Sequence, residues 1–184
     1  MTTLIVVRHG QTAWNATGRF QGQADPPLDA VGRRQARAAA VALATYAPTR
    51  IVSSDLVRAR QTADAIASHV ALPVAVDRRL REVALGGWQG LDRRSAAHQF
   101  PDEYAAWIAG DDVRRGGGET EDEAGRRVAA VLAELAVGDG TVVVVSHGLA
   151  LRAGLRLLAP DDAAHLRNGR WVVVTRSADP LLSV

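Results

Sequence analysis

Two short segments, far apart in the chain, end in the same way, and both could do chemistry. Leu4–Gly10 reads LIVVRHG, and Val142–Gly148 reads VVVVSHG. Each begins with a run of aliphatic residues, which favours a strand covered on both faces, and ends in a polar residue, a histidine and a glycine. In parallel α/β sheets, ligands bind beyond the carboxyl ends of the strands. If the two strands are parallel and close together, we expect His9 and His147 to face the same crevice.

The neighbours of these histidines are suited to binding an anion. The glycine after each of them, Gly148 in the second motif, lets backbone N–H groups approach a ligand closely. Arg8 directly precedes His9, and Arg58 lies in the first turn of a helix predicted after the strand Arg50–Ser53. Helix N-termini attract anions, and guanidinium groups bind phosphate oxygens in pairs. Alone, Arg58 is better explained as a solvated helix residue, but beside the histidines it is a candidate phosphate clamp.

A pair of histidines can also bind a metal ion. A divalent cation would need carboxylate ligands as well, and the neighbouring arginines would repel it, so we expect no metal here. The sequence has no cysteine, which leaves histidine as the candidate nucleophile for attack on phosphorus. Such a reaction needs guanidinium groups to balance the oxygen charges and an acid for the leaving oxygen. Glu82, in LREVALGGWQG, is the candidate acid, although its position alone equally fits an exposed surface glutamate.

Composition narrows the class of protein. The chain has 184 residues, 47% of them hydrophobic, and a net charge of +2, which fits one folded domain and excludes disorder of the whole chain. The absence of cysteine excludes disulfides and thiolate zinc sites. No run is long and apolar enough for a membrane span, and no secretory signal is evident, so we expect a cytoplasmic protein without membrane contact.

The arginine content leaves a nucleic-acid-binding protein as an alternative class. The sequence contains no lysine, so all 22 cationic residues are arginine, and the pI is near 9.9. The high pI arises because few groups titrate between histidine and arginine. The arginines are scattered among 20 acidic residues rather than clustered, and we therefore expect no nucleic-acid partner.

Short apolar runs alternate with helical patterns, which predicts an α/β fold with a mainly parallel sheet. The predicted strands are Leu4–Val7, Arg50–Ser53, Pro73–Val76, Thr141–Val145 and an edge strand, Trp171–Thr175. The predicted helices are Ala30–Thr45 after an Asp29 cap, a stripe from Leu56 to Val70, a stripe ending at Leu135 after a Thr120–Glu123 capping box, and Leu149–Leu158.

The segment 86–118 differs from the rest because it is rich in glycine. It contains two short polar helix candidates, Arg93–Gln99 and Asp102–Ala109. We interpret it as an excursion that covers the active site of a single domain, residues 1–184. Its Trp88 and Trp107 could contact a substrate, but such residues more often anchor a cover to the core.

The remaining histidines are expected to be surface or capping residues: His69, His98 and His165.

Taken together, these motifs resemble those of the histidine phosphatase superfamily, the phosphoglycerate-mutase-like enzymes. The matching segments are RHGQTAWNATGRFQGQADPPLDAVGRRQA at 8–36, SSDLVRARQTA at 53–63, LREVALGGWQG at 80–90, GGGET at 116–120 and VVVVSHG at 142–148. A single RHG is a weak signal, whereas these motifs in this order cover almost the whole chain and are specific.

The resemblance implies a three-layer α/β/α sandwich and phosphoryl transfer through a phosphohistidine. In such an enzyme, His9 becomes phosphorylated, and Glu82 protonates the leaving oxygen and then activates the incoming water. The groups implied to bind the phosphoryl group are Arg8, Arg58 and His147, the last also stabilising the transition state, and the positions that line its pocket in relatives are Asn15, Gln21 and Gly22. No metal or organic cofactor is implied.

The chain departs from the family pattern at two places. Gln89 replaces the usual glutamate of the GxWEG motif, and the sequence ends soon after Trp171–Thr175, where many relatives continue with a hairpin. The short excursion and tail favour a phosphatase acting on a small phosphorylated metabolite. The alternatives are a cofactor-dependent phosphoglycerate mutase and a non-catalytic phosphate-binding protein. A homodimer through an edge strand is left open.

Overall fold

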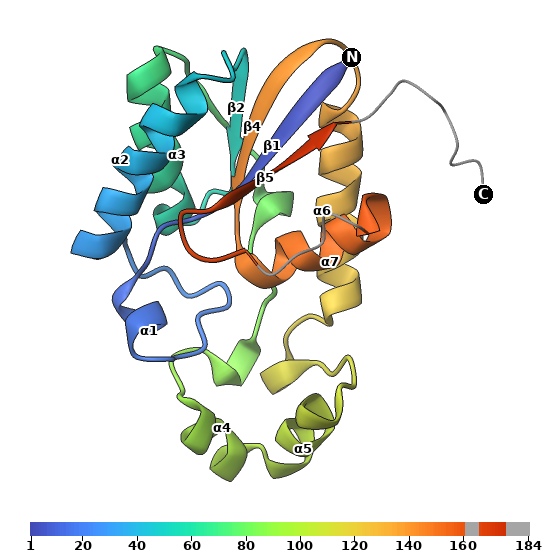
Figure 1. Ribbon diagram of the computed structural model, residues 1–184. Coiled ribbons are helices and arrows are strands. Elements are labelled where there is room, and N and C mark those ends of the chain that lie inside the picture. The colour runs from blue at the N-terminus through green and yellow to red at the C-terminus, as the bar shows by residue number, and fades with distance from the viewer. Residues whose placement is uncertain (161–165, 176–184) are drawn as a thin grey trace.

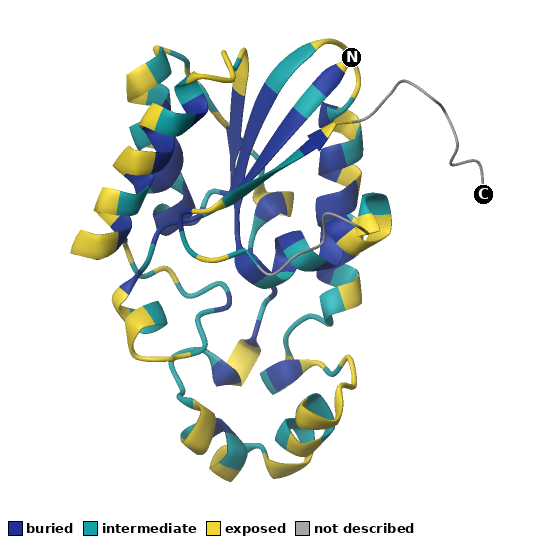
Figure 2. Cartoon of the chain, viewed as in Figure 1, coloured by how far each residue is buried: buried dark blue, intermediate teal, exposed yellow. Residues whose placement is uncertain are grey.

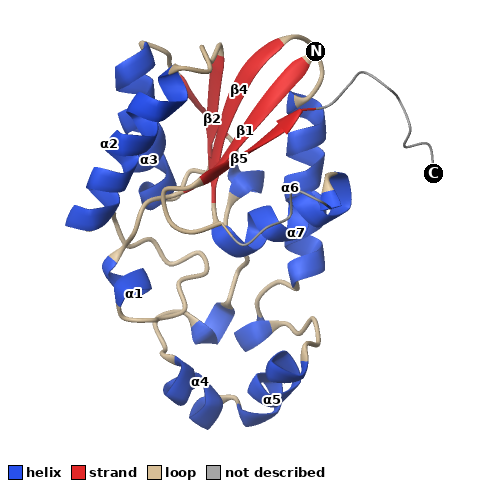
Figure 3. Cartoon of the chain, viewed as in Figure 1, coloured by secondary structure: helices blue, strands red, loops and turns tan. Residues whose placement is uncertain are grey.

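The computed structural model describes residues 1–160 and 166–175. Within them, a five-stranded sheet lies between two layers of helices, as expected for an α/β/α sandwich (Figures 1 and 3). The strands are β1 (Thr2–Arg8), β2 (Arg50–Ser53), β3 (Val74–Val76), β4 (Gly140–Ser146) and β5 (Trp171–Thr175). The helices are α1 (Ala13–Ala16), α2 (Ala30–Ala44), α3 (Val57–Val70), α4 (Arg93–Gln99), α5 (Pro101–Ala109), α6 (Glu121–Leu135) and α7 (Gly148–Leu158), and the 3-10 helices are η1 (Arg78–Leu80), η2 (Gly86–Trp88) and η3 (Arg115–Gly117).

The sheet is mostly parallel, as predicted, with the strand order β3-β2-β4-β1-β5. β1, β4, β2 and β3 run in one direction, and β5 is an antiparallel edge strand. Arg8 at the end of β1 lies opposite Ser146 at the end of β4, and Ser53 at the end of β2 lies opposite Val145. The residues that follow these three strands therefore emerge side by side at one edge of the sheet.

Alternate residues of the central strands supply two separate cores. Ile5 and Val7 face α2 and α3, while Leu4 and Val6 face α6 and α7. The buried residues accordingly line both faces of the sheet (Figure 2). Because side chains alternate along a strand, a continuous aliphatic run is what a strand covered on both faces requires.

The two predicted helix caps are present. Asp29 accepts a hydrogen bond from the Gly32 N–H at the start of α2, and Thr120 forms a capping box with Glu123 at the start of α6. These caps satisfy N–H groups that a helix N-terminus leaves without partners. The four-residue helix α1 was not predicted, because it is too short to show an apolar period.

The segment 86–118 lies outside the sheet, beyond the carboxyl ends of β1 and β4, and carries η2, α4, α5 and η3 (Figure 1). Trp88 is fully buried at the centre of an aromatic cluster, with Phe20 at 5.1 Å and Tyr104 at 5.7 Å between ring centroids. Trp107 packs edge-on against Trp88 at 5.7 Å. Both tryptophans thus anchor the segment. Its description as an excursion of one domain stays a prediction.

Candidate active site

The structure brings together the two histidines that end the matching motifs. The ring centroids of His9 and His147 are 5.1 Å apart, and both side chains are buried. The parallel register of β1 and β4 causes this approach, because each histidine directly follows its strand. The backbone N–H of His9 donates to the Ser146 carbonyl at 3.0 Å, which fixes the two strand ends together.

Hydrogen bonds leave one nitrogen of His9 suited to nucleophilic attack. Its Nδ1 lies 2.6 Å from the Gly10 carbonyl oxygen, an acceptor, so the ring proton belongs on Nδ1. Nε2 then carries the lone pair and accepts from Arg58 Nε at 3.3 Å. Burial holds the pKa of His9 well below its usual range, and the charges of Arg58 and Arg8 lower it further. His9 is therefore a neutral imidazole at physiological pH.

Arg58 is a fully buried guanidinium with a fixed orientation. Its two terminal nitrogens donate to the carbonyl oxygens of Gly22 and Ala24, each at 2.7 Å, while Nε points to His9. Burial lowers the pKa of Arg58 to about 10, and the charge of Glu82 opposes that shift. Arg58 thus stays charged at neutral pH beside His9, where an anion would be stabilised strongly.

Arg8 brings a second guanidinium to the same place. It donates to the Leu166 carbonyl at 2.8 Å, and its buried Nε has no hydrogen-bond partner among the residues that the structure describes. Gly148 permits this position, because a Cβ there would lie 3.1 Å from the Arg8 guanidinium carbon. A buried N–H donor without a partner is costly, so it marks a place where a ligand oxygen would be stabilised.

His147 is oriented by a serine that the sequence reasoning missed. Its Nε2 lies 2.9 Å from Ser54 Oγ, and this oxygen accepts from the Leu56 N–H at 3.3 Å. The Ser54 hydroxyl proton can therefore point to His147 Nε2, which places the ring proton on Nδ1. That buried Nδ1 has no partner within the described part of the chain. Ser54 follows β2 as the histidines follow β1 and β4, and this shared position is the signal that could have found it.

Glu82 is held at the same site rather than exposed on the surface. Its side chain is only 9% exposed. The carboxylate accepts from the backbone N–H groups of Leu149 (3.2 Å), Ala150 (2.8 Å) and Val83 (3.0 Å). Two of these donors belong to the first turn of α7, where the helix dipole favours an acidic group. The candidate acid and His147 are thus positioned by the same helix.

The remaining pocket candidates form a loop network beside His9. Asn15 Oδ1 accepts from the Thr12 N–H at 3.1 Å, and Gln21 Oε1 accepts from the Thr12 hydroxyl at 2.8 Å. Asn168, which no sequence motif indicated, donates to the His9 carbonyl at 3.1 Å and to Asn15 Oδ1 at 3.2 Å. This network orders the loop that follows His9.

The other residues that the sequence analysis singled out are three histidines and Gln89. His69 and His98 are exposed, and His165 lies outside the described residues. Gln89 Oε1 accepts from the Gln23 N–H at 2.7 Å, so its amide serves as an acceptor in the loop after Gly22. Across residues 1–160 and 166–175, no group of three or more His, Cys, Asp or Glu side chains could hold a metal ion, and no helix is long and apolar enough to cross a membrane.

Comparison with known proteins assigns the chain to a family. A family model described as the histidine phosphatase superfamily, branch 1, matches residues 4–178. The chain belongs to this superfamily. It is 40% identical to a glucosyl-3-phosphoglycerate phosphatase of Mycolicibacterium vanbaalenii, over 92% of this chain and 82% of the relative. It is 36% identical to a metal-independent phosphoserine phosphatase of Arabidopsis thaliana, over 94% and 80%.

A solved structure extends the likeness to three dimensions. The mycobacterial glucosyl-3-phosphoglycerate phosphatase in complex with VO3 superposes with a TM-score of 0.83 at 36% identity, covering 94% of this chain and 92% of that one. The predicted superfamily and fold class are therefore confirmed. The family model and the names of these relatives support an enzyme with phosphatase activity.

Proposed function

We propose that the protein hydrolyses its phosphomonoester in two steps through a phosphohistidine on His9. In the first step, His9 Nε2 attacks phosphorus, the ester P–O bond breaks, and Glu82 donates a proton to the leaving oxygen. In the second, Glu82 takes a proton from water, which attacks the phosphoryl group, and the N–P bond breaks. The observation that carries this proposal is the buried His9, whose Nδ1 faces the Gly10 carbonyl at 2.6 Å and whose Nε2 faces Arg58 Nε at 3.3 Å.

The groups around His9 suit a dianionic phosphoryl group. Arg8 and Arg58 bring two positive charges into a buried site, where each interaction is stronger than in water. His147 adds a neutral N–H donor at Nδ1, which can hydrogen-bond an equatorial oxygen without placing a third charge nearby. These donors stay fixed during the reaction, because carbonyl groups and Ser54 hold them.

For the substrate, we propose a phosphomonoester of a small carboxylic acid. The names of the two relatives support this class, since glucosyl-3-phosphoglycerate and phosphoserine both contain a phosphorylated three-carbon acid. A screen of cellular phosphomonoesters, reported as relative kcat/KM, tests this proposal. A clear preference for phosphates of sugars that carry no carboxylate would contradict it.

A homodimer, a cytoplasmic location and the absence of nucleic-acid binding stay predictions.

Hydrolysis and mutase activity differ in what attacks the phosphohistidine. We expect water to attack, so that 3-phosphoglycerate incubated with a trace of 2,3-bisphosphoglycerate releases inorganic phosphate. The measurement is phosphate release alongside the formation of 2-phosphoglycerate. Conversion to 2-phosphoglycerate without phosphate release would instead assign the mutase reaction.

Replacing Glu82 by glutamine is expected to slow the reaction most for esters with poor leaving groups. Glutamine keeps the size of the side chain but cannot donate a proton to the leaving oxygen. We expect kcat/KM, which reports the step that breaks the ester bond, to fall by roughly 10²–10⁴-fold for phenyl phosphate and much less for 4-nitrophenyl phosphate, because 4-nitrophenolate needs little protonation. An equal fall of kcat/KM for both esters would remove Glu82 from the role of acid.

A further inference from the structure

The GGGET motif and helix α6 contribute no group to the site described above, yet they pack closely against the segment after Glu82. A Cβ on Gly118 would lie 2.0 Å from the Ala84 carbonyl oxygen, and one on Gly116 would lie 2.4 Å from the Gly87 nitrogen. Backbone therefore touches backbone at these points, and only glycine permits it. The motif therefore packs against the backbone segment that carries Glu82, the candidate acid.

Glu119 of this motif binds the same segment at two points. Its backbone N–H donates to the Ala84 carbonyl at 2.9 Å, and its Oε2 accepts from the Ala84 N–H at 2.9 Å. Both polar backbone groups of Ala84, two residues beyond Glu82, are thus satisfied by one residue.

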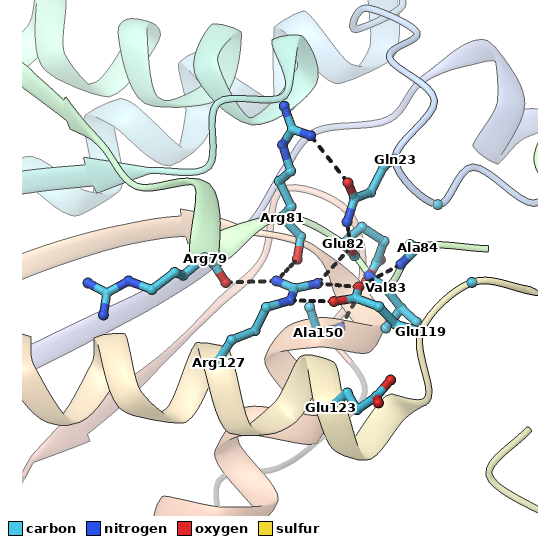
Figure 4. A network of polar contacts seen from close by, with 12 residues as sticks. Gln23, Arg79, Arg81, Glu82, Val83, Ala84, Glu119, Glu123, Arg127 and Ala150 are labelled. Carbon is cyan, nitrogen blue, oxygen red and sulfur yellow. Dashed lines mark hydrogen bonds and ion pairs between the residues drawn. The ribbon is translucent and has the colours of Figure 1, made fainter. Parts of the chain in front are cut away.

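Arg127 of α6 lies beside Glu119 and binds the same segment around Glu82 (Figure 4). It donates to the carbonyl oxygens of Arg79 (2.7 Å), Arg81 (2.6 Å) and Glu82 (2.9 Å). It also donates to Glu119, from Nε at 2.9 Å and from a terminal nitrogen at 2.8 Å. The five N–H donors of one guanidinium are therefore all used, and a lysine ammonium, with three donors on one atom, could not reproduce this arrangement.

We propose that Arg127 and Glu119 are positioning residues that act as a clamp on the catalytic acid. This inference rests on the proposed role of Glu82. The clamp fixes the backbone of residues 79–84, while the N-terminus of α7 fixes the carboxylate of Glu82, so the acid is held from both ends. A catalytic group must stay close to its productive position, because a displacement of about 1 Å can lower the rate on the order of 10²-fold.

The first test compares Arg127→Leu with the matched control Arg126→Leu. Arg126 is the neighbouring residue of α6, its side chain is 72% exposed against 19% for Arg127, and it pairs with Asp122 at the surface. We expect Arg127→Leu to lower kcat/KM for phenyl phosphate by about 10²-fold but kcat/KM for 4-nitrophenyl phosphate by less than about tenfold. Arg127→Lys should restore part of the loss, and Arg126→Leu should behave as the wild type. Equal losses on both esters would show a general structural role and overturn the proposal.

Hydrogen exchange tests the clamp without relying on activity. The amides of Val83, Leu149 and Ala150 donate to the Glu82 carboxylate, so they should exchange at least about tenfold faster in Arg127→Leu, while those of Ile5 and Val143 in the central strands keep their wild-type rates. Unchanged exchange at the three amides would refute the clamp. If the wild-type protein hydrolysed neither ester, the proposed function would fail. The exchange rates of these amides would still show whether Arg127 holds the segment that carries Glu82.

A second variant covers the case in which Arg127→Leu fails to fold. Glu119→Gln keeps an amide oxygen for the Ala84 N–H but removes the charge that pairs with Arg127. We expect the same selective loss on phenyl phosphate at a smaller size, about tenfold. A Glu119→Gln protein with wild-type rates on both esters and wild-type exchange would contradict the assignment.

Discussion

Replacing His9 by alanine is expected to remove phosphatase turnover. Hydrolysis of 4-nitrophenyl phosphate should fall by on the order of 10⁶-fold, the scale seen when an enzyme loses a covalent nucleophile. The reason is specific to this site, since the Nδ1 proton of the buried His9 is bound to the Gly10 carbonyl and its Nε2 presents the lone pair toward Arg58. The measurement is steady-state phosphate release in the presence of a metal chelator.

The matched control for this variant is His98→Ala. His98 is exposed on α4 and has no contact with the site, so its replacement should leave kcat/KM unchanged. His9→Ala removes the acceptor of Arg58 Nε, but it should keep the fold because Arg58 retains its bonds to the Gly22 and Ala24 carbonyls. A folded His9→Ala protein that retained metal-free turnover would remove His9 from its proposed role.

Replacing Arg58 by methionine is expected to lower kcat/KM by about 10³-fold, the lower end of what a transition-state arginine contributes in phosphoryl transfer. Methionine has a similar length and no charge, so it leaves no buried ion without a partner. The variant loses the charge beside His9 and the donors to the Gly22 and Ala24 carbonyls. Arg58→Lys keeps the charge and should lose less.

The same pair of variants should differ in their dependence on pH. The charge of Arg58 helps to lower the pKa of His9, so its removal raises the pKa of His9 toward the usual value near 6.5. Only the neutral imidazole attacks phosphorus, and activity attributable to His9 is lost as pH falls through its pKa. The acid limb of kcat/KM should therefore move to higher pH in Arg58→Met than in wild type or Arg58→Lys. Identical pH profiles in all three proteins would contradict this account.

The sequence was sufficient to predict the five strands, the longer helices and the two motifs at the ends of β1 and β4. Continuous aliphatic runs predicted buried parallel strands, and the polar residues after them marked the crevice. The distance between the two motifs depends on the register of β1 against β4. This register aligns Arg8 with Ser146 and brings the ring centroids of His9 and His147 to 5.1 Å. No local pattern encodes that register.

Residues that act through long-range contacts were harder to find. Glu82 fits an exposed glutamate until α7 brings two backbone N–H groups to its carboxylate. Asn168 reaches His9 across 159 positions of the chain, and Arg127 reaches Glu82 across 45. Their residue types are ordinary for surface loops and helices, so only the packed structure distinguishes them from their neighbours.

The most direct test of the central claim is to identify the residue that carries phosphate during turnover. The Glu82→Gln protein is mixed with 4-nitrophenyl phosphate, quenched in alkali and digested, and the phosphopeptide is sequenced by mass spectrometry. The variant is chosen because water attack should be slow without the carboxylate, so the intermediate should accumulate. We predict phosphate on His9, stable in alkali and released in acid. Phosphate on any other residue, or turnover with no phosphorylated peptide at all, would contradict the account.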